Sequence, residues 1–334
     1  MWHRIIGFLI LLVSLFAGWA WQDYRGFLDT PLQLPEQGLV YEVAPGSHIR
    51  NIARDLTAKG VLDAPWYLRL YARQSGLAPK LRAGEYRITP GMTPRGLLAL
   101  LVSGRTVQYP LTLLEGWTFT QVRQAIAGQP ILRQTLAGQD DAAVMAALGL
   151  PGQHPEGRFF PDTYRFPRGT TDLDFLRRAH ERMQQVLDSA WQGRAEGLPL
   201  HSPDEALVLA SIVEKETGVP EERPEIAGVF VRRLEHGMRL QTDPTIIYGL
   251  GDAFDGNLRR RDLIRDTPYN TYTRAGLPPT PICMPGEASI LAALHPADGK
   301  ALYFVSRGDG THQFSATIEQ HNAAVRRYQL KRDQ

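Results

Sequence analysis

An unbroken apolar run near the N-terminus is the feature that most constrains this chain. Residues 5–21 carry no charge between Arg4 and Asp23. At about 1.5 Å of rise per residue, a helix over this run is about 25 Å long, which is at the short end of a bilayer crossing but longer than a usual signal-peptide core. We predict a membrane anchor over 5–21. A cleaved signal peptide is the alternative, because Gly18-Trp19-Ala20 offers a small-x-small cleavage pattern.

The charges that flank this run predict its orientation. Arg4 and the terminal amine precede the run, whereas Asp23 and Arg25 cancel each other after it. The positive-inside tendency therefore favours a short cytoplasmic start at residues 1–4, with the large remainder outside the cytoplasm.

The overall composition excludes several classes of protein. Among 334 residues, 37 Lys and Arg nearly balance 35 Asp and Glu, and 43% are hydrophobic, so the chain is not disordered and has no broad basic field for nucleic acid. Cys283 is the single cysteine, and the nine histidines include no His-x-x-x-His pair. With no glycine-rich nucleotide motif either, we expect no metal and no cofactor.

Residues 22–38 separate the apolar run from a patterned region. They contain Pro31, Pro35 and Gly38 without helical periodicity, which is typical of a linker. From residue 39 the pattern becomes a strand at 40–43, a Pro-Gly turn, and a helix that begins after Ser47 as N-cap and ends before Gly60.

The same strand-turn-helix pattern recurs twice. A second copy has a strand at 86–88, a turn at Gly91 and a helix that ends at Gly104, and a weaker third copy surrounds Gly116. Units this small bury their apolar faces only by packing together. The first copy, over residues 41–53, resembles a LysM module, which implies a βααβ fold over 39–106 and a cell-wall sugar ligand. A purely structural role for its Pro-Gly turn is the alternative.

A nearly continuous apolar stretch predicts a buried helix from Pro203 to the Glu214-Lys215-Glu216 segment. Only Ser211 interrupts the apolar residues between 206 and 213, so the helix is apolar almost all round. At 100° per residue, Glu216 and Glu214 lie about 160° apart. Glu216 shares its face with bulky aliphatic side chains: Leu209, Ile212 and Val213. Such surroundings favour a neutral carboxyl able to act as a general acid at a glycosidic oxygen. The alternative is that Glu214 and Glu216 are surface residues at the C-terminal end of the helix, on either side of Lys215.

Three turn-rich segments carry side chains suited to sugars. Residues 156–166 combine aromatic and acidic groups, whereas 238–245 and 267–272 supply uncharged donors and acceptors. From these segments we predict the following substrate-binding residues: Phe160, Asp162, Tyr164, Gln241, Thr242, Asp243, Tyr269, Asn270 and Tyr272. Ordinary structured turns are the alternative. We interpret the basic cluster of Arg259, Arg260 and Arg261 as a solvated or ion-paired surface. Contact with an anionic polymer or lipid is the alternative.

Four segments together resemble one family. Residues 209–217, 239–245, 269–272 and 276–279 are similar in order and spacing to motifs of the YceG-like (MltG) family of endolytic peptidoglycan transglycosylases. The resemblance extends over essentially the whole chain. It implies an α+β catalytic domain over 107–334, with the second glutamate of Glu214-Lys215-Glu216-Thr217 as the catalytic residue.

The resemblance also implies the reaction and its setting. Glu216 would protonate the oxygen of the β-1,4 bond between N-acetylmuramic acid and N-acetylglucosamine, and would then deprotonate the muramic C6 hydroxyl as it closes on C1. The expected products end in 1,6-anhydromuramic acid, and the cut limits elongation of nascent strands. Implied partners are glycan strands and peptidoglycan synthases. The implied location is the inner (cytoplasmic) membrane, with a periplasmic catalytic domain.

Two other functions are open on the sequence alone. A hydrolase would use Glu216 as the acid and Asp243 or Asp162 as the base for water. A non-catalytic wall-binding scaffold would need none of these groups to titrate.

Overall fold

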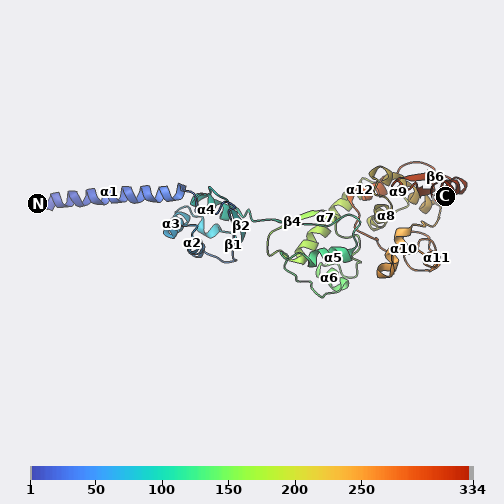
Figure 1. The fold of residues 1–334 in the computed structure, drawn as a ribbon, viewed down its shortest axis with the longest axis horizontal. Helices are drawn as coiled ribbons and strands as arrows, with labels where there is room; N and C mark the ends of the chain where they lie inside the picture. The colour runs from blue at the N-terminus through green and yellow to red at the C-terminus, as the bar shows by residue number, and fades with distance from the viewer. Residues whose placement is uncertain (1, 331–334) are drawn as a thin grey trace. The chain divides into compact units, whose positions relative to one another are not determined.

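The structure is a computed structural model that describes residues 2–330 (Figure 1). Met1, the first residue of the predicted cytoplasmic start, and residues 331–334 of the predicted catalytic domain lie outside the described part. Contacts divide the chain into two compact units. The first comprises Met1–Tyr109 with Phe166–Gly169, and the second comprises Pro110–Arg165 with Thr170–Gln334.

The apolar run forms the first part of helix α1 (Trp2–Asp29), which is long and apolar enough to cross a membrane. Its side chains are exposed along the run. The helix does not stop where the apolar residues stop, so residues 22–29 of the expected linker are helical. The reason is tertiary: Tyr24 and Leu28 are buried against the rest of the first unit, and this packing outweighs weak local propensity.

The rest of the first unit is a two-stranded antiparallel sheet covered by helices. Its strands pair from Leu39↔Ile88 to Val43↔Gly84. The elements, in chain order, are β1 (Leu39–Val43), α2 (Ile49–Ala58), α3 (Pro65–Gln74), a 3₁₀ turn (Ala78–Lys80), β2 (Gly84–Ile88) and α4 (Pro94–Ser103). The N-cap prediction for Ser47 is wrong. Ser47 still belongs to the preceding turn, because its amide donates to the Ala44 carbonyl. The helix therefore begins one residue later, with His48 as an N-cap that makes no side-chain cap bond.

The three predicted strand-turn-helix units are confirmed. The third unit consists of β3 (Tyr109–Thr112) and α5 (Phe119–Ala127). Gly46, Gly91 and Gly116 occupy equivalent turns with φ of 76°, 83° and 74°, a left-handed conformation that favours glycine. Glycine therefore recurs in the three units because each turn needs a left-handed backbone conformation.

Helix α8 (Pro203–Glu216) lies at the centre of the second unit, among α7, α9 and α12 (Figure 1). All residues from 206 to 213 are buried, which confirms the predicted all-round burial. β3 pairs with β4, and β5 pairs antiparallel with β6. The remaining elements are α6 (Asp141–Ala147), β4 (Thr163–Phe166), α7 (Asp172–Gln192), α9 (Arg223–Glu235), α10 (Asp243–Leu250), α11 (Arg260–Ile264), α12 (Glu287–Leu294), β5 (Tyr303–Ser306), β6 (His312–Ser315) and α13 (Ile318–Tyr328), with short 3₁₀ turns at Pro220–Glu222 and Gly251–Ala253.

Candidate active site

The two glutamates at the end of α8 contact different parts of the fold. The Glu214 carboxylate accepts hydrogen bonds from the Gly286 amide at 3.0 Å and the Ser289 hydroxyl at 2.7 Å, at the start of α12. The Glu216 carboxyl instead accepts one from the Thr242 hydroxyl, at the start of α10. The prediction that the two glutamates lie on different faces of α8 is confirmed. Glu214 links α8 to α12.

The Gln-Thr-Asp and Tyr-Asn-Thr-Tyr segments meet beside Glu216. The Gln241 amide donates to the Thr271 carbonyl at 3.2 Å, and the Thr242 amide donates to the Thr271 hydroxyl at 3.1 Å. The Tyr272 hydroxyl donates to Asp243 at 2.6 Å. Because Thr242 is only 2% exposed and is held through its backbone, its hydroxyl has a fixed direction toward the carboxyl.

The surroundings of Glu216 favour its neutral form. Burial raises the pKa of this carboxyl from 4.5 to about 7. The hydrogen bond from Thr242 and the electrostatic interaction with His312 lower this pKa, whereas the negative charge of Asp243 raises it further. A carboxyl with a pKa near 7 is present in both protonation states at neutral pH, so it can give up a proton and later accept one.

A hollow of about 350 Å³ opens beside Glu216. The sequence predicts bulky aliphatic neighbours for this carboxyl, but the hollow is lined mainly by polar and charged residues. Glu214 and Lys215 come from the end of α8 itself, and Glu115, Gln121 and Arg223 come from other segments. Burial, together with the charge of Glu214, also raises the pKa of Glu115. Glu115, Trp117, Gln121 and Arg223 are not among the residues predicted from the sequence. The one feature of the sequence that could have indicated the first three is the third strand-turn-helix unit. In the structure, the Lys215 ammonium donates to the carbonyl oxygen of Gly116, in the turn of that unit, at 3.4 Å.

Gln241 and Tyr269 occupy well-defined positions in the same two segments. Gln241 has φ of 53° and is the only non-glycine residue among 2–330 in the left-handed region, a backbone strain of about 1–3 kcal/mol that is common at functional sites. Its side-chain oxygen accepts from Arg233 at 3.2 Å. The Tyr269 hydroxyl lies 2.8 Å from the Thr280 hydroxyl, and its ring packs edge-on against Tyr248.

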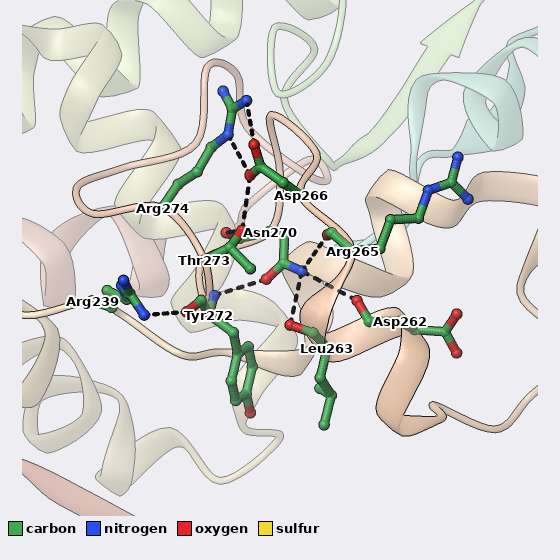
Figure 2. Close-up of polar contacts among 9 residues, drawn as sticks. All are labelled: Arg239, Asp262, Leu263, Arg265, Asp266, Asn270, Tyr272, Thr273 and Arg274. Carbon is green, nitrogen blue, oxygen red and sulfur yellow. Dashed lines mark hydrogen bonds and ion pairs between the residues drawn. The ribbon is translucent and has the colours of Figure 1, made fainter.

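The amide of Asn270 is fully engaged inside the protein, as Figure 2 shows. Its nitrogen donates to the carbonyls of Asp262, Leu263 and Arg265 at 2.7–3.1 Å, and its oxygen accepts from the Tyr272 amide at 2.9 Å. The side chain is 1% exposed. Asn270 therefore holds the C-terminal end of α11 against the Tyr272 segment, and its contact with a sugar stays a prediction.

Ion pairs occupy part of the basic region in this loop. Asp266 accepts from Arg274 at 2.8 and 3.0 Å and from the Thr273 hydroxyl at 2.9 Å (Figure 2). Arg259 pairs with Asp255 at 2.6 Å. The Arg259 ion pair agrees with the interpretation of the Arg259–Arg261 cluster as a solvated or ion-paired surface.

None of the predicted residues in segment 156–166 lines the hollow beside Glu216. Phe160 is buried in the core, and its carbonyl accepts from the Tyr164 hydroxyl at 2.7 Å. Asp162 and Tyr164 line a separate hollow of about 460 Å³ next to α7, and no residue of this hollow lines the one beside Glu216. A substrate role for these three residues stays a prediction.

A second buried glutamate shows that a shifted pKa alone does not identify the site. Burial raises the pKa of Glu156 to about 7 as well. However, Glu156 is 3% exposed, and its two oxygens accept from the Phe119 amide at 2.9 Å and the Tyr248 hydroxyl at 3.1 Å. Glu216 differs from Glu156 in that it lines a hollow. Glu115 lines the same hollow and also has a raised pKa, but the carboxyl that the Thr242 hydroxyl holds is that of Glu216.

These observations define the class of site. A carboxyl with a pKa near 7, held by a buried hydroxyl, in a residue that lines a polar hollow, has the features that general acid–base catalysis requires. In residues 2–330, no three His, Cys, Asp or Glu side chains are grouped in a way that could hold a metal ion.

The chain belongs to the YceG-like family, whose model matches residues 41–327. It is 32% identical over 303 residues to the endolytic murein transglycosylase of Bacillus subtilis (strain 168), covering 86% of this chain and 83% of that protein. It is 28% identical over 358 aligned positions to the endolytic murein transglycosylase of Streptococcus pneumoniae (strain D39), covering 96% of this chain and 64% of that protein. A 2.6 Å crystal structure of a YceG-like protein from Listeria monocytogenes is similar in fold, with a TM-score of 0.54, 31% identity, and coverage of 86% of this chain and 99% of that one.

Proposed function

We propose that this chain is an endolytic murein transglycosylase that cuts the β-1,4 bond between N-acetylmuramic acid and N-acetylglucosamine inside glycan strands. The observation that carries the proposal is Glu216, a carboxyl with a pKa near 7 at the edge of a polar hollow. Membership of the YceG-like family and the names of the Bacillus and Streptococcus relatives support the same activity. The comparisons offer no support for a hydrolase or a scaffold.

In the proposed mechanism, Glu216 acts twice. The protonated carboxyl donates its proton to the glycosidic oxygen while the bond from C1 of the muramic acid to that oxygen breaks. The resulting carboxylate accepts the proton of the muramic C6 hydroxyl as that oxygen bonds to C1. The proton balance closes without water, so a second carboxylate is not required. Thr242 holds one carboxyl oxygen in place during both steps.

The neighbouring residues would bind the sugar units on either side of the bond. We assign this role to Gln241, Asp243, Tyr269 and Tyr272, which belong to the two segments that meet beside Glu216. Asn270 would act by holding its loop in place. Phe160, Asp162 and Tyr164 line or adjoin a separate hollow and would contact the strand farther from the cut.

The remaining parts of the proposal concern location and organisation. We assign α1 as a single membrane crossing with a cytoplasmic N-terminus, so that the catalytic part is periplasmic and acts beside peptidoglycan synthases to limit strand length. Residues 39–106 would be a LysM-like module that binds glycan, a proposal supported by the strand-helix-helix-strand order of β1, α2, α3 and β2. The part from 107 onward would be the catalytic domain.

Mass spectrometry of digested glycan strands tests the activity. Full-length protein in detergent is incubated with purified strands in ¹⁸O-labelled water, beside the Glu216→Gln variant. We expect fragments that end in 1,6-anhydromuramic acid and carry no ¹⁸O, formed by the unsubstituted protein and not by the variant. Reducing ends that carry ¹⁸O would instead establish hydrolysis, and strand binding without any cleavage would establish a scaffold.

A further inference from the structure

The end of α1 is fixed to the first unit by side-chain contacts. The Tyr67 hydroxyl donates to Asp23 at 2.7 Å, and the Tyr24 hydroxyl donates to Gln74 at 2.9 Å, so α3 is held at two points. Arg95 at the start of α4 donates to Asp29 at 2.8 Å. Three contacts spread over the last two turns of α1 prevent the unit from turning freely about the helix. Its orientation relative to α1 is therefore defined.

These contacts place the beginning of α3 beside the end of the apolar run. Asp23, the partner of Tyr67, is two residues beyond Trp21. Aromatic rings continue across the junction, with centroids 5.9 Å apart for Trp21 and Tyr24, 5.3 Å for Tyr24 and Tyr67, and 5.8 Å for Tyr67 and Trp66. Trp66 consequently stands at the level where the hydrocarbon of a bilayer crossed by α1 would end.

The outer face of α3 has the composition of an interfacial helix. Leu68 and Ala72 are buried, whereas Trp66 is 59% exposed and Leu70, one turn later, is 42% exposed. Between residues 22 and 109, the only other exposed large apolar side chain is Val40.

Two cations lie next to this apolar pair. Arg69 and Arg73 are exposed and also one turn apart on α3. Tryptophan and leucine flanked by arginine are typical of segments that lie in the lipid headgroup region, with the apolar groups toward the acyl chains and the cations toward phosphate.

We propose that the face of α3 formed by Trp66, Arg69, Leu70 and Arg73 is a membrane-docking surface. Its occupant is the lipid interface of the same bilayer that α1 crosses, because the surface continues the exposed side chains of α1 at the level of Asp23. The inference rests on the proposed membrane crossing by α1, and it adds that the first unit lies against the membrane in one orientation.

Site-directed spin labelling of the full chain tests this surface. Cys283 is buried and is the only cysteine, so Cys283→Ala gives a background without reactive thiols. A nitroxide is attached to Trp66→Cys, to Ala58→Cys on the exposed side of α2 as the matched control, and to Leu12→Cys inside the apolar run. Each protein is placed in vesicles of phosphatidylethanolamine and phosphatidylglycerol. The measurement compares collision of the label with oxygen, which concentrates in lipid, and with a water-soluble nickel chelate.

We expect the oxygen-to-nickel collision ratio at position 66 to exceed that at position 58 by several-fold and to approach that at position 12. If position 12 is in lipid but position 66 matches position 58, the docking surface is refuted while the membrane crossing stands. A label at 66 that is shielded from both reagents would show a protein occupant and would also refute the docking surface. If position 12 is exposed to the nickel chelate, both the crossing and the docking surface are wrong.

Discussion

Glu214 and Glu216 leave the same end of α8 toward different partners, Glu214 toward the start of α12 and Glu216 toward Thr242. Two residues of the same type therefore have different roles in the structure. Both residues line the hollow at the end of α8, but the Glu214 carboxylate joins α8 to α12, whereas the Glu216 carboxyl is held by the Thr242 hydroxyl.

Substitution of the two glutamates should therefore affect stability differently. Glu214→Ala removes the acceptor for the Gly286 amide and the Ser289 hydroxyl, so we expect a loss of about 1.5–3 kcal/mol in the free energy of unfolding of the second unit. Glu216→Gln keeps its volume and an oxygen that can accept from Thr242, so we expect no loss. Denaturant titration at pH 5 measures both. Equal destabilisation would mean that Glu216 is also a structural residue.

The free energy of unfolding should depend on pH through Glu216. Its pKa is about 7 in the folded protein and 4.5 without the fold, so the folded state binds the proton more tightly. Between these values, the unfolded chain has lost its proton while the folded protein keeps it, and the stability of the unsubstituted protein falls as pH rises. Relative to Glu216→Gln, we expect the loss to approach about 3 kcal/mol above pH 7. A difference that does not change between pH 4.5 and 8 would contradict the raised pKa.

The rate of cleavage should follow the protonated fraction of Glu216, because the first step needs its proton. We expect the rate to fall above about pH 7. Thr242→Val removes the hydroxyl that donates to the carboxylate, so the pKa of Glu216 rises and the alkaline limb of the pH–rate profile moves to higher pH.

Thr245→Val is the matched control for this shift. The Thr245 hydroxyl is buried and bonds to the Thr242 carbonyl at 2.8 Å, without a contact to Glu216 among the described residues. We expect its alkaline limb to stay in place. The interpretation of Thr242 fails if the two variants move the limb equally or if neither moves it.

Asn270 should stabilise the C-terminal end of α11. Asn270→Ala leaves the carbonyls of Asp262, Leu263 and Arg265 without their donor, which costs on the order of 1–3 kcal/mol locally. Hydrogen exchange of residues 259–266 should therefore become faster. Asn257→Ala, at an exposed position before α11, is the control and should leave this exchange unchanged. Unchanged exchange in Asn270→Ala would leave sugar contact as its main role.

Sequence patterns predicted best what depends on neighbouring residues. The apolar run from 206 to 213 predicted a buried helix, and helical geometry separated Glu216 from Glu214 without any knowledge of their partners. Likewise, the repeated Pro-Gly and Glu-Gly turns predicted three equivalent units.

What the sequence could not predict depends on contacts between distant segments. The helical state of residues 22–29 arises from packing of Tyr24 and Leu28 on helices far along the chain. Glu115 and Gln121 reach the hollow only because the third strand-turn-helix unit folds next to the end of α8. In the same way, the sequence does not show that the side-chain amide of Asn270 donates to carbonyls at the C-terminal end of α11.

The most direct test of the central claim is the rate at which anhydro-ended fragments form from glycan strands, measured with equal amounts of the unsubstituted protein, Glu216→Gln and Glu156→Gln. Both glutamates have a pKa near 7, but only Glu216 faces the hollow. We expect Glu216→Gln to lower the rate by about 10²- to 10⁴-fold, with a far smaller effect of Glu156→Gln. Anhydro-ended fragments that form at an undiminished rate in Glu216→Gln would show that Glu216 is not the catalytic acid.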